Sequence, residues 1–354
     1  MKKDKKILLI TGGLSNEKEL SLISGEDVAQ ALIIENQNTE VLEITDDKRM
    51  LLYPDSKSFL DRKSVKDDKK VRVFNSLDFS VLKEKNFDVA FLALDGKFGE
   101  DGQVQVLLDL VDIPYTGSGT MASSIGMNKS KSYEYVSCFG IAVPEYFIVY
   151  RHDYDLEEIT KKIENTINFP CVIKPNDSGS SIGVSSADSK CELQSSLLEA
   201  FKYSEIAIVQ KFIKGREFAC GVLGNTGYSK LEILPVVESI IKDFKVFTHH
   251  QKYYDNDIEE ICPAKIEDTL AKKIMGDAES VHRILGCDGL SRSDFRYDEK
   301  KDKVYFLEVN TSPGHTKNSI CPQEARSIGM TFGEFILKQI DLVLKKRECV
   351  KVRA

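Results

Sequence analysis

Acidic and amide side chains stand at alternate positions in two neighbouring stretches, Arg292-Ser293-Asp294 and Glu308-Val309-Asn310. In a β-strand, residues two apart point to the same face. A hairpin joining the two stretches would gather Asp294, Glu308 and Asn310 with Arg292 on one surface. Carboxylate and amide oxygens suit Mg²⁺, which completes its coordination with the phosphates of a substrate. The pattern predicts a magnesium site; the plainer alternative is a structural ion pair between Arg292 and a carboxylate.

A second polar cluster follows a predicted buried strand, in the segment Lys174-Pro175-Asn176-Asp177-Ser178-Gly179-Ser180-Ser181-Ile182-Gly183. The lysine offers a point charge, and the flexible loop offers N–H and hydroxyl donors, a combination that suits polyphosphate. The spacing is not that of a P-loop, and the segment lacks the G-x-G-x-x-G pattern of dinucleotide-binding proteins. An ordinary surface turn is the alternative interpretation.

Single residues elsewhere are weaker signals. Lys129 and Lys211 add positive charge that could serve the same phosphates, although lone lysines are usually solvated. Glu17 stands near the start of a predicted helix, where a negative charge stabilises the helix dipole. The sequence Lys252-Tyr253 lies in a predicted loop, where exposed aromatic residues more often indicate binding than packing.

Composition excludes several classes of protein. The chain has 354 residues and a formal net charge of −7, which argues against a nucleic-acid backbone binder with its basic surface. No apolar run approaches the roughly 20 residues of a membrane-spanning helix, and the N-terminal apolar run is too short for a signal peptide. The eight cysteines include no C-x-x-C pair, which is typical of reduced, mostly buried thiols. We expect a cytoplasmic protein with neither nucleic-acid nor membrane partners.

The elements that must position these residues predict an α/β and α+β architecture. Apolar runs at 7–10, 41–44 and 87–94, with a helix after the first, predict an N-terminal parallel α/β domain. Ser15 is expected to cap that helix. The charge-dense residues 46–70 are expected to form a solvated excursion. The proline and glycines of 114–119 predict a boundary near 120–126.

Two further units are predicted after this boundary. In the second, strands over 146–150, 171–174 and 206–212 alternate with helices over 129–138, 156–167 and 192–203, which indicates a small α+β unit. The third has strands over 218–223, 231–237, 290–297 and 304–310. Its helices are predicted over 268–285 and 331–345.

Taken together and in order, the motifs resemble those of the D-alanine–D-alanine ligases of the ATP-grasp superfamily, over nearly the whole chain. The matching blocks are residues 12–21, Gly99-Glu100-Asp101-Gly102, Pro114-Tyr115-Thr116-Gly117-Ser118-Gly119, Met127-Asn128-Lys129, Lys174-Pro175 with 179–183, Lys252-Tyr253, Arg292-Ser293-Asp294 and 308–314. The resemblance implies three domains: an N-terminal substrate and dimer domain (1–125), a central lid domain (126–213) and a C-terminal catalytic domain (214–354). It implies ATP between the last two, and a homodimer.

The resemblance also implies a reaction and a role for each matching residue. One D-alanine is phosphorylated by ATP to an acylphosphate, which the amine of a second D-alanine attacks through a tetrahedral intermediate. Two Mg²⁺ ions, replaceable by Mn²⁺, would be held by Asp294, Glu308 and Asn310. The implied ATP contacts are Lys129, Lys174 and Lys252 for phosphate, Gln210, Lys211 and Ile213 for adenine and Glu217 for ribose. Arg292 and Gly314 would stabilise the oxyanion.

The resemblance also implies which residues bind the two D-alanine molecules. Glu17 would bind the first ammonium within a hydrogen-bonded group with Ser180 and Tyr253, and Ser319 and Ile320 would bind the second D-alanine. Three residues depart from the family pattern. Asp95 stands where a histidine is usual, Gln210 where a glutamate contacts the adenine amino group, and His315 where the residue is usually apolar.

Three alternatives stay open at the level of sequence. D-serine differs from D-alanine by one hydroxyl, so a D-alanine–D-serine ligase is a close alternative. Another ATP-grasp carboxylate–amine ligase would share the metal and phosphate residues but should lack the set of Glu17, Ser180 and Tyr253. A catalytically silent nucleotide-binding module would not need Arg292 and the metal ligands intact.

Overall fold

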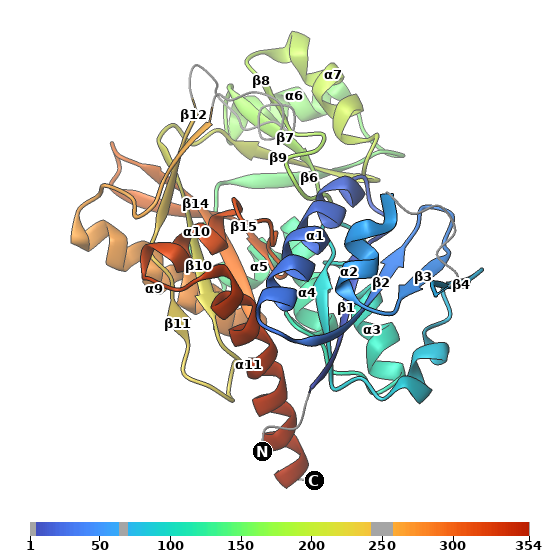
Figure 1. The fold of residues 1–354 in the computed structure, drawn as a ribbon. Helices are drawn as coiled ribbons and strands as arrows, with labels where there is room; N and C mark the ends of the chain where they lie inside the picture. Colours follow the sequence, from blue (N-terminus) through green and yellow to red (C-terminus); the bar gives the residue numbers. More distant parts are fainter. Residues whose placement is uncertain (1–4, 64–69, 242–257, 354) are drawn as a thin grey trace.

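The computed structural model describes residues 5–63, 70–241 and 258–353. Three β-sheets follow one another along the chain, and Figure 1 shows them as blue to cyan, green, and yellow to red regions. The N-terminal sheet mixes parallel and antiparallel strands, and the other two are antiparallel. This arrangement confirms the predicted combination of α/β and α+β units.

The N-terminal sheet has the order β4-β3-β2-β1-β5. Strands β1 (Lys6–Gly12), β2 (Asn38–Ile44) and β5 (Val89–Ala93) are parallel. Ile7 and Leu9 pack in one cluster with helix α1 (Lys18–Ile34), whereas Leu8 and Ile10 pack on the other face with α3 (Gln103–Leu110). Both faces are covered, so the strand reads as a continuous apolar run.

Two local predictions for this domain are wrong. Helix α1 begins at Lys18 with Glu17 as its N-cap residue, and Ser15 is not the cap; the Ser15 hydroxyl accepts the Glu17 N–H (3.1 Å) and donates to the Asp95 carbonyl (2.7 Å). Part of the segment 46–70 is not a solvated excursion. It contains β3 (Met50–Tyr53), helix α2 (Ser56–Leu60) and a 3₁₀ turn (Asp61–Lys63). Met50 and Leu52 are buried, because they pair with β2 and add apolar surface to the core.

The rest of the N-terminal domain consists of short strands and helices around its sheet. Strand β4 (Arg72–Phe74) pairs antiparallel with β3, and a 3₁₀ helix (Phe79–Lys85) covers the sheet beside α3. Helix α4 (Thr120–Met127) runs across the expected boundary near residue 125, and α5 (Lys129–Ser137) follows it.

The central sheet has the order β6-β9-β7-β8 and is covered on one face only. Its strands are β6 (Tyr146–Tyr150), β7 (Cys171–Pro175), β8 (Ser185–Ala187) and β9 (Ile206–Lys211). Helices α6 (Leu156–Asn165) and α7 (Lys190–Ala200) pack on Cys171, Ile173 and Val209. The alternate residues Val172, Lys174 and Gln210 therefore point to the opposite face, toward the C-terminal sheet.

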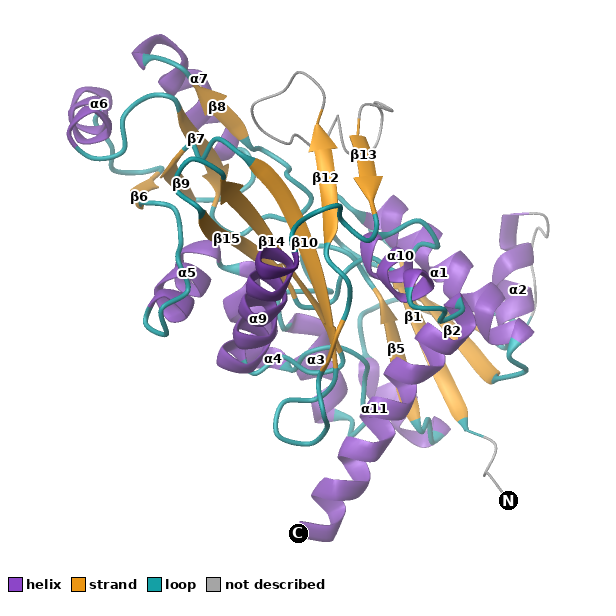
Figure 2. Cartoon of the chain, turned by 90° about the vertical axis from the view of Figure 1, so that its left-hand side faces the viewer, coloured by secondary structure: helices purple, strands orange, loops and turns teal. Residues whose placement is uncertain are grey.

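The C-terminal sheet runs β13-β12-β10-β14-β15, with β11 beside β10. Its strands are β10 (Arg216–Leu223), β11 (Glu232–Ile233), β12 (Val237–Ile241), β13 (Ile258–Ile261), β14 (Leu290–Asp298) and β15 (Lys303–Asn310). Helices α5 and α9 (Asp268–Leu285) bury Phe218, Phe295 and Phe306 on one face, and Figure 2 shows α9 lying along the sheet. The other face is apolar where α10 and α11 pack on Leu223 and Leu290 and carries polar residues elsewhere.

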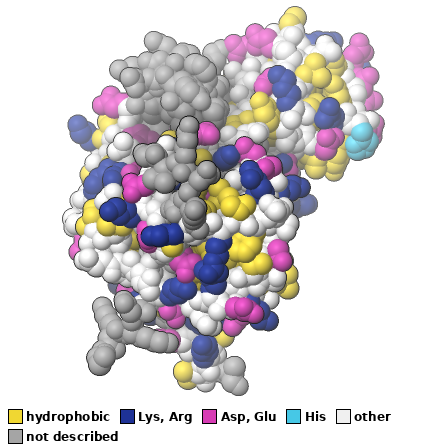
Figure 3. Space-filling model, turned by 45° about the vertical axis from the view of Figure 1, so that its right-hand side comes forward, with side chains coloured by type: hydrophobic (Ala, Val, Ile, Leu, Met, Phe, Trp, Pro, Cys, Tyr) yellow, Lys and Arg dark blue, Asp and Glu magenta, His cyan; other side chains and the backbone are white. Residues whose placement is uncertain are grey.

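Two helices complete the chain. Helix α10 (Ile320–Ser327) contacts β10, and α11 (Phe332–Arg353) packs against α1 and β5, so the C-terminal segment ties the third sheet to the first. No helix among the described residues is long and apolar enough to cross a membrane. The eight cysteines are free thiols, of which four are buried rather than most. The face in Figure 3 mixes acidic and basic side chains.

Candidate active site

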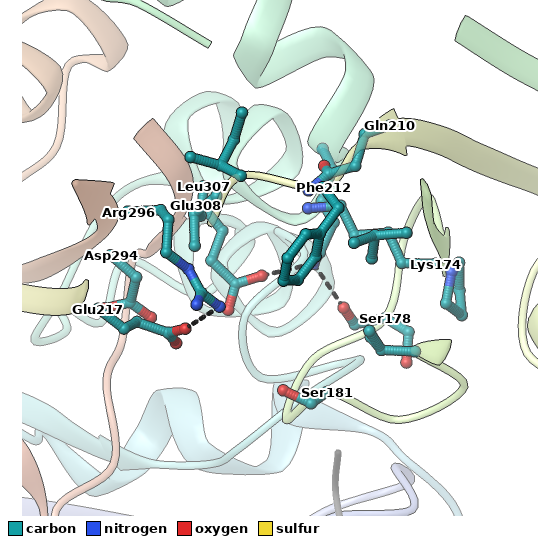
Figure 4. A pocket seen from close by; sticks show the side chains of 15 residues that line it. Lys174, Ser178, Ser181, Gln210, Phe212, Glu217, Asp294, Arg296, Leu307 and Glu308 are labelled. Carbon is teal, nitrogen blue, oxygen red and sulfur yellow. Dashed lines mark hydrogen bonds and ion pairs between the residues drawn. The ribbon is translucent and has the colours of Figure 1, made fainter. Parts of the chain in front are cut away.

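A pocket lies between the open face of the central sheet and the C-terminal sheet. It is lined by Lys129, Val172, Lys174, Pro175, Ser178, Ser181, Val184, Gln210, Phe212, Ile213, Glu217, Asp294, Arg296, Leu307 and Glu308. Apolar side chains line one part of it and charged ones another, which suits a ligand with a flat apolar group and phosphates. Figure 4 shows Phe212 projecting into this space. The volume of this cavity is about 90 Å³.

Two buried lysines provide the positive charge of this pocket. The Lys129 ammonium donates to the Ser178 carbonyl at 2.6 Å and lies 3.1 Å from a Glu308 oxygen. Burial, followed by the nearby charge of Lys129, lowers the pKa of Lys174 to about 7, against the opposing effects of Glu308 and Glu217. A phosphate placed here would meet both ammonium groups and restore the charge of Lys174.

Two other residues implied by the resemblance also line the pocket. Ile213 is buried, and the Glu217 carboxylate accepts from Arg296 at 2.6 Å. The Lys211 side chain is not brought to the pocket: its ammonium donates to Glu145 at 2.7 Å near the surface. Gln210 is buried at the apolar end, where its amide oxygen lies 3.0 Å from the Tyr133 hydroxyl.

The three predicted metal ligands lie together as the hairpin required. The register pairs Asp294 with Glu308 and Arg292 with Asn310. The Asn310 amide nitrogen donates to Asp294 at 3.3 Å, so its amide oxygen is the atom left for a cation. Among the described residues, no three Asp, Glu, His or Cys side chains form a metal site. Two carboxylates and an amide oxygen fit Mg²⁺ if phosphate oxygens complete the coordination.

A second pocket of about 370 Å³ lies between the N-terminal domain and the C-terminal sheet. Its lining includes the predicted residues Glu17, Ser180, Arg292, Asn310, Gly314, Ser319 and Ile320. The Ser180 hydroxyl donates to the Glu17 carboxylate, which links the central domain to the N-terminal one. A Cβ on Gly179 would lie 2.8 Å from a Glu17 oxygen, so a larger residue here would displace the Glu17 carboxylate.

The floor of this second pocket brings together backbone and hydroxyl groups of one turn. The Ser319 hydroxyl accepts the Thr316 N–H at 3.2 Å, and a Cβ on Gly314 would lie 3.1 Å from that hydroxyl oxygen. Ile320 is 9% exposed and offers an apolar wall. The Arg292 guanidinium lines the pocket while holding Asp294, whose charge raises the pKa of Arg292 further above its ordinary value despite burial.

Sequence reasoning missed two acidic residues of this pocket. Glu100 accepts the Gly96 N–H at 3.0 Å, and burial, followed by the charges of Glu17 and Asp95, raises the pKa of its carboxyl well above the ordinary value. Asp95 is buried and accepts from Ser24 at 3.4 Å. Both line the second pocket. Glu100 belongs to a matching block of the sequence, which was the available signal.

Four consecutive loop residues are divided between the two pockets. Ser178 and Ser181 line the first pocket, whereas Gly179 and Ser180 line the second. Ser180 and Ser181 have φ values of +47° and +56°, a left-handed conformation that turns the chain between the pockets. Arg292 and Asp294, which are ion-paired, face the second and first pocket respectively.

The remaining expectations concern Lys252, Tyr253 and His315. Lys252 and Tyr253 lie outside the described residues. The His315 side chain points away from the second pocket into the core, where its ring packs on Phe91 (5.0 Å between centroids) and bonds Gln339 at 3.0 Å. Burial lowers the pKa of His315 to about 4, so it is a neutral core residue.

Comparison with known proteins identifies the family. Residues 6–118 match the model of the D-ala D-ala ligase N-terminus, and residues 135–341 match that of the D-ala D-ala ligase C-terminus. The chain belongs to the D-alanine–D-alanine ligase family. It is 34% identical over 344 residues to a D-alanine--D-alanine ligase of Carboxydothermus hydrogenoformans, with 97% of this chain and 99% of that protein covered. A Geobacter sulfurreducens relative of the same name is 36% identical, covering 94% and 92%.

Solved structures of this family share the fold. The VanG D-Ala:D-Ser ligase from Enterococcus faecalis superposes with a TM-score of 0.83 at 32% identity, covering 96% of this chain and all of that one. A D-alanine-D-alanine ligase from Coxiella burnetii gives 0.80 at 23% identity, covering 99% and 98%. The ATP-grasp fold and a place in the ligase family of peptidoglycan synthesis follow for this chain, whereas the second amino acid does not.

Proposed function

We propose that this protein ligates two D-alanine molecules to D-alanyl-D-alanine and converts ATP to ADP and phosphate. The observation that supports this reaction most directly is that the two pockets meet at the Arg292–Asp294 ion pair. A phosphate donor on one side and an amino-acid carboxylate on the other would meet at this pair. Phosphoryl transfer depends on such positioning and on charge neutralisation more than on covalent help from the protein.

In the first step, a carboxylate oxygen of the first D-alanine attacks the γ-phosphorus of ATP. The bond from that phosphorus to the bridging oxygen breaks, and ADP and an acylphosphate form. Lys129 and Lys174 offset the phosphate charge, with Ser178 and Ser181 beside them. Gln210, Ile213 and Glu217 form the nucleoside end. The backbone of Lys211 and the side chain of Lys252 complete the proposed nucleotide contacts.

In the second step, the amine of the second D-alanine attacks the acylphosphate carbon and loses a proton. Arg292 and the Gly314 N–H donate hydrogen bonds to the oxyanion of the tetrahedral intermediate, which collapses as phosphate leaves. Glu17 binds the first ammonium, held by Ser180 and Tyr253. Ser319 binds the second carboxylate and Ile320 contacts its methyl group.

Divalent cations are part of the proposal. Asp294, Glu308 and Asn310 would hold two Mg²⁺ ions, or Mn²⁺ in their place. When bound, such ions neutralise charge on the transferring phosphoryl group. The chain's own contribution is the strand register that keeps the three oxygen ligands on one surface.

A second candidate is a D-alanine–D-serine ligase. The similarity to the VanG D-Ala:D-Ser ligase favours it, and so do the polar residues Glu260 and Asn318, which line the second pocket with Ile320. A serine hydroxyl could bond to either. We favour D-alanine because Ile320 is apolar, and D-serine binding would place the hydroxyl beside it.

The test is ADP release with D-alanine, D-serine, D-lactate or L-alanine, with the products identified by mass. D-Ala-D-Ala as the main product of an equimolar D-alanine and D-serine mixture supports the proposal. More D-Ala-D-Ser supports the second candidate. ADP binding without any ligation supports a silent nucleotide-binding module or a ligase for other substrates. The homodimer and the cytoplasmic location remain predictions.

A further inference from the structure

The Tyr133 hydroxyl is the centre of a buried polar network behind the first pocket. Tyr133 is fully buried on α5. Its oxygen lies 2.8 Å from the Lys174 ammonium, 2.8 Å from the Leu307 carbonyl oxygen and 3.0 Å from the Gln210 amide oxygen. Three strands and one helix therefore meet at one hydroxyl group.

This hydroxyl has one hydrogen and two lone pairs. Lys174 can only donate when it is protonated, the form that a bound phosphate favours, and it then takes one lone pair. The two remaining partners, as placed, are both acceptors, and one hydrogen cannot serve both. A conflict of this kind inside the protein is costly, because a buried acceptor without a donor loses the hydrogen bond it had in water.

The Tyr133 hydroxyl is expected to donate its hydrogen to the Leu307 carbonyl rather than to Gln210. Strands β14 and β15 pair Asp294 with Glu308 but Phe295 with Phe306, so Leu307 is the extra residue of a β-bulge. Residues at a bulge are left out of the ladder of hydrogen bonds, so the carbonyl benefits from a donor outside the sheet. The Tyr133 hydroxyl supplies that donor at the shorter of the two distances.

A half-turn of the Gln210 amide removes the conflict. The amide nitrogen then donates to the second lone pair of Tyr133, and the amide oxygen turns toward the pocket. The two ends of an amide have nearly the same shape, so the network of partners decides its orientation. The three contacts of Tyr133 are then compatible: Lys174 and Gln210 donate to Tyr133, and Tyr133 donates to Leu307.

We propose that Tyr133 is a positioning residue that fixes the Gln210 amide with its oxygen toward the pocket, and so selects a purine carrying an amino group at position 6. The base would lie at the apolar end, between Val172, Phe212 and Leu307, with Gln210 as the polar group at its edge. An amide oxygen accepts from the amino group of adenine and repels the keto oxygen of hypoxanthine. This inference rests on the proposed function, specifically on the use of a purine nucleotide.

The test compares the affinities for ADP and IDP by calorimetry, which needs no turnover. The two ligands differ at position 6, where IDP has an acceptor and an N1–H. The unsubstituted protein should bind ADP more tightly by about tenfold, as expected for one hydrogen bond gained against one clash. Equal binding, or tighter binding of IDP, overturns the orientation without any variant.

Tyr133→Phe removes only the hydroxyl and should lower the ADP:IDP ratio by about fivefold or more. Gln210→Glu is the matched background, since a carboxylate presents an acceptor in either orientation. In that background, adding Tyr133→Phe should leave the ratio within about twofold. A Tyr133→Phe protein that loses affinity for both nucleotides equally would mean a merely structural role. No binding of either nucleotide to the unsubstituted protein would instead overturn the proposed function itself.

Discussion

The guanidinium of Arg292 donates to both carboxylate oxygens of Asp294, at 2.7 Å each. Arg292 precedes Asp294 by two residues on the same strand. Both side chains are nearly buried, with 9% and 16% of their surface exposed. The alternative interpretation of the sequence, a structural ion pair, therefore coexists with the predicted metal site. Asp294 is shared between stability and chemistry, whereas Glu308 on the neighbouring strand is not held by Arg292.

Asp294→Asn and Glu308→Gln should separate these two roles. Removing the charge of Asp294 leaves Arg292 buried without its counter-ion, so we expect a loss of about 3 kcal/mol in the free energy of unfolding. Glu308→Gln should cost less, about 1 to 2 kcal/mol, because Lys129 loses its ion-pair partner but keeps its bond to Ser178, and the Glu308 side chain is 26% exposed. Both variants should lose ligase activity by about a hundredfold or more. Urea unfolding and ADP release measure the two quantities; equal stability losses would contradict the distinction.

The contact between Ser180 and Glu17 should govern binding of the first amino acid. Ser180→Ala removes the hydroxyl that bonds the Glu17 carboxylate, and we expect the KM of the first D-alanine to rise on the order of tenfold. ADP affinity should change little, since Ser180 does not line the first pocket. Ser195→Ala is the control, because its hydroxyl donates to the Glu192 carbonyl on the exposed side of α7. A parallel loss of ADP affinity would show that the loop acts as a whole.

The ion pair of Lys97 with Asp177, at 2.9 Å, also joins the N-terminal and central domains. Both side chains are well exposed, so the pair is weak and screened by salt. Lys97→Glu should raise substrate KM values about two- to fivefold at low salt. The effect should vanish near 1 M salt, where the screening length is about 3 Å. Adding Asp177→Lys should restore the low-salt values; no rescue would exclude the pair as the cause.

Nucleotide binding should depend on pH through Lys174. The pKa of this lysine is about 7 without ligand, and a phosphate favours the protonated form. Affinity for magnesium-free ADP should therefore be full below about pH 6 and fall by about tenfold per pH unit above 7, until the raised pKa of the complex is reached. At about pH 8 the protein should take up close to one proton on binding, measurable by calorimetry in buffers of different ionisation enthalpy.

Lys174→Arg is the matched control for this pH dependence. Arginine keeps its charge throughout the range, so the slope above pH 7 should disappear. A slope that persists in this variant would assign the titration to another group.

The buried histidine beside the second pocket predicts a pH dependence of stability. The pKa of His315 is about 4 in the folded protein, below its ordinary value of 6.5, so the unfolded chain binds more protons between these values. The free energy of unfolding should therefore fall as the pH drops from about 6.5 to 4, with His315 contributing about 3 kcal/mol. His282, with a pKa of about 4, adds to the same trend. His315→Gln should reduce this pH dependence by about half in urea unfolding, and an unchanged curve would contradict the assignment.

Sequence reasoning located most of the secondary structure and the hairpin of β14 and β15. The β-bulge in that hairpin, however, depends on contacts made only in the assembled sheet. Strict alternation would place Phe306, Glu308 and Asn310 on one face. The structure buries Phe306 against α9 and turns Glu308 and Asn310 to the site. The bulge at Leu307 makes this possible, and its stability comes from the partner strand and Tyr133. No local pattern of the sequence contains those contacts.

The same limit explains the other differences. Residues 50–53 look unremarkable within a charged segment, and they become a strand because β2 offers an edge to pair with. Glu100 becomes a site residue through burial beside Glu17 and Asp95, which are far from it or only weakly marked in the sequence. Conversely, Ser319 and Ile320 are predicted from the resemblance to the family rather than from a local pattern, and both line the second pocket.

The division of residues 178–181 between the two pockets has a kinetic consequence. Because one short loop supplies neighbouring residues to both pockets, a ligand that moved the loop in one pocket would also move residues that line the other. Water that reached the acylphosphate would waste one ATP for each molecule destroyed. In the proposed reaction, a loop shared in this way would couple closure over the nucleotide to binding of the first amino acid at Glu17, so protection of the acylphosphate from water would depend on these four residues.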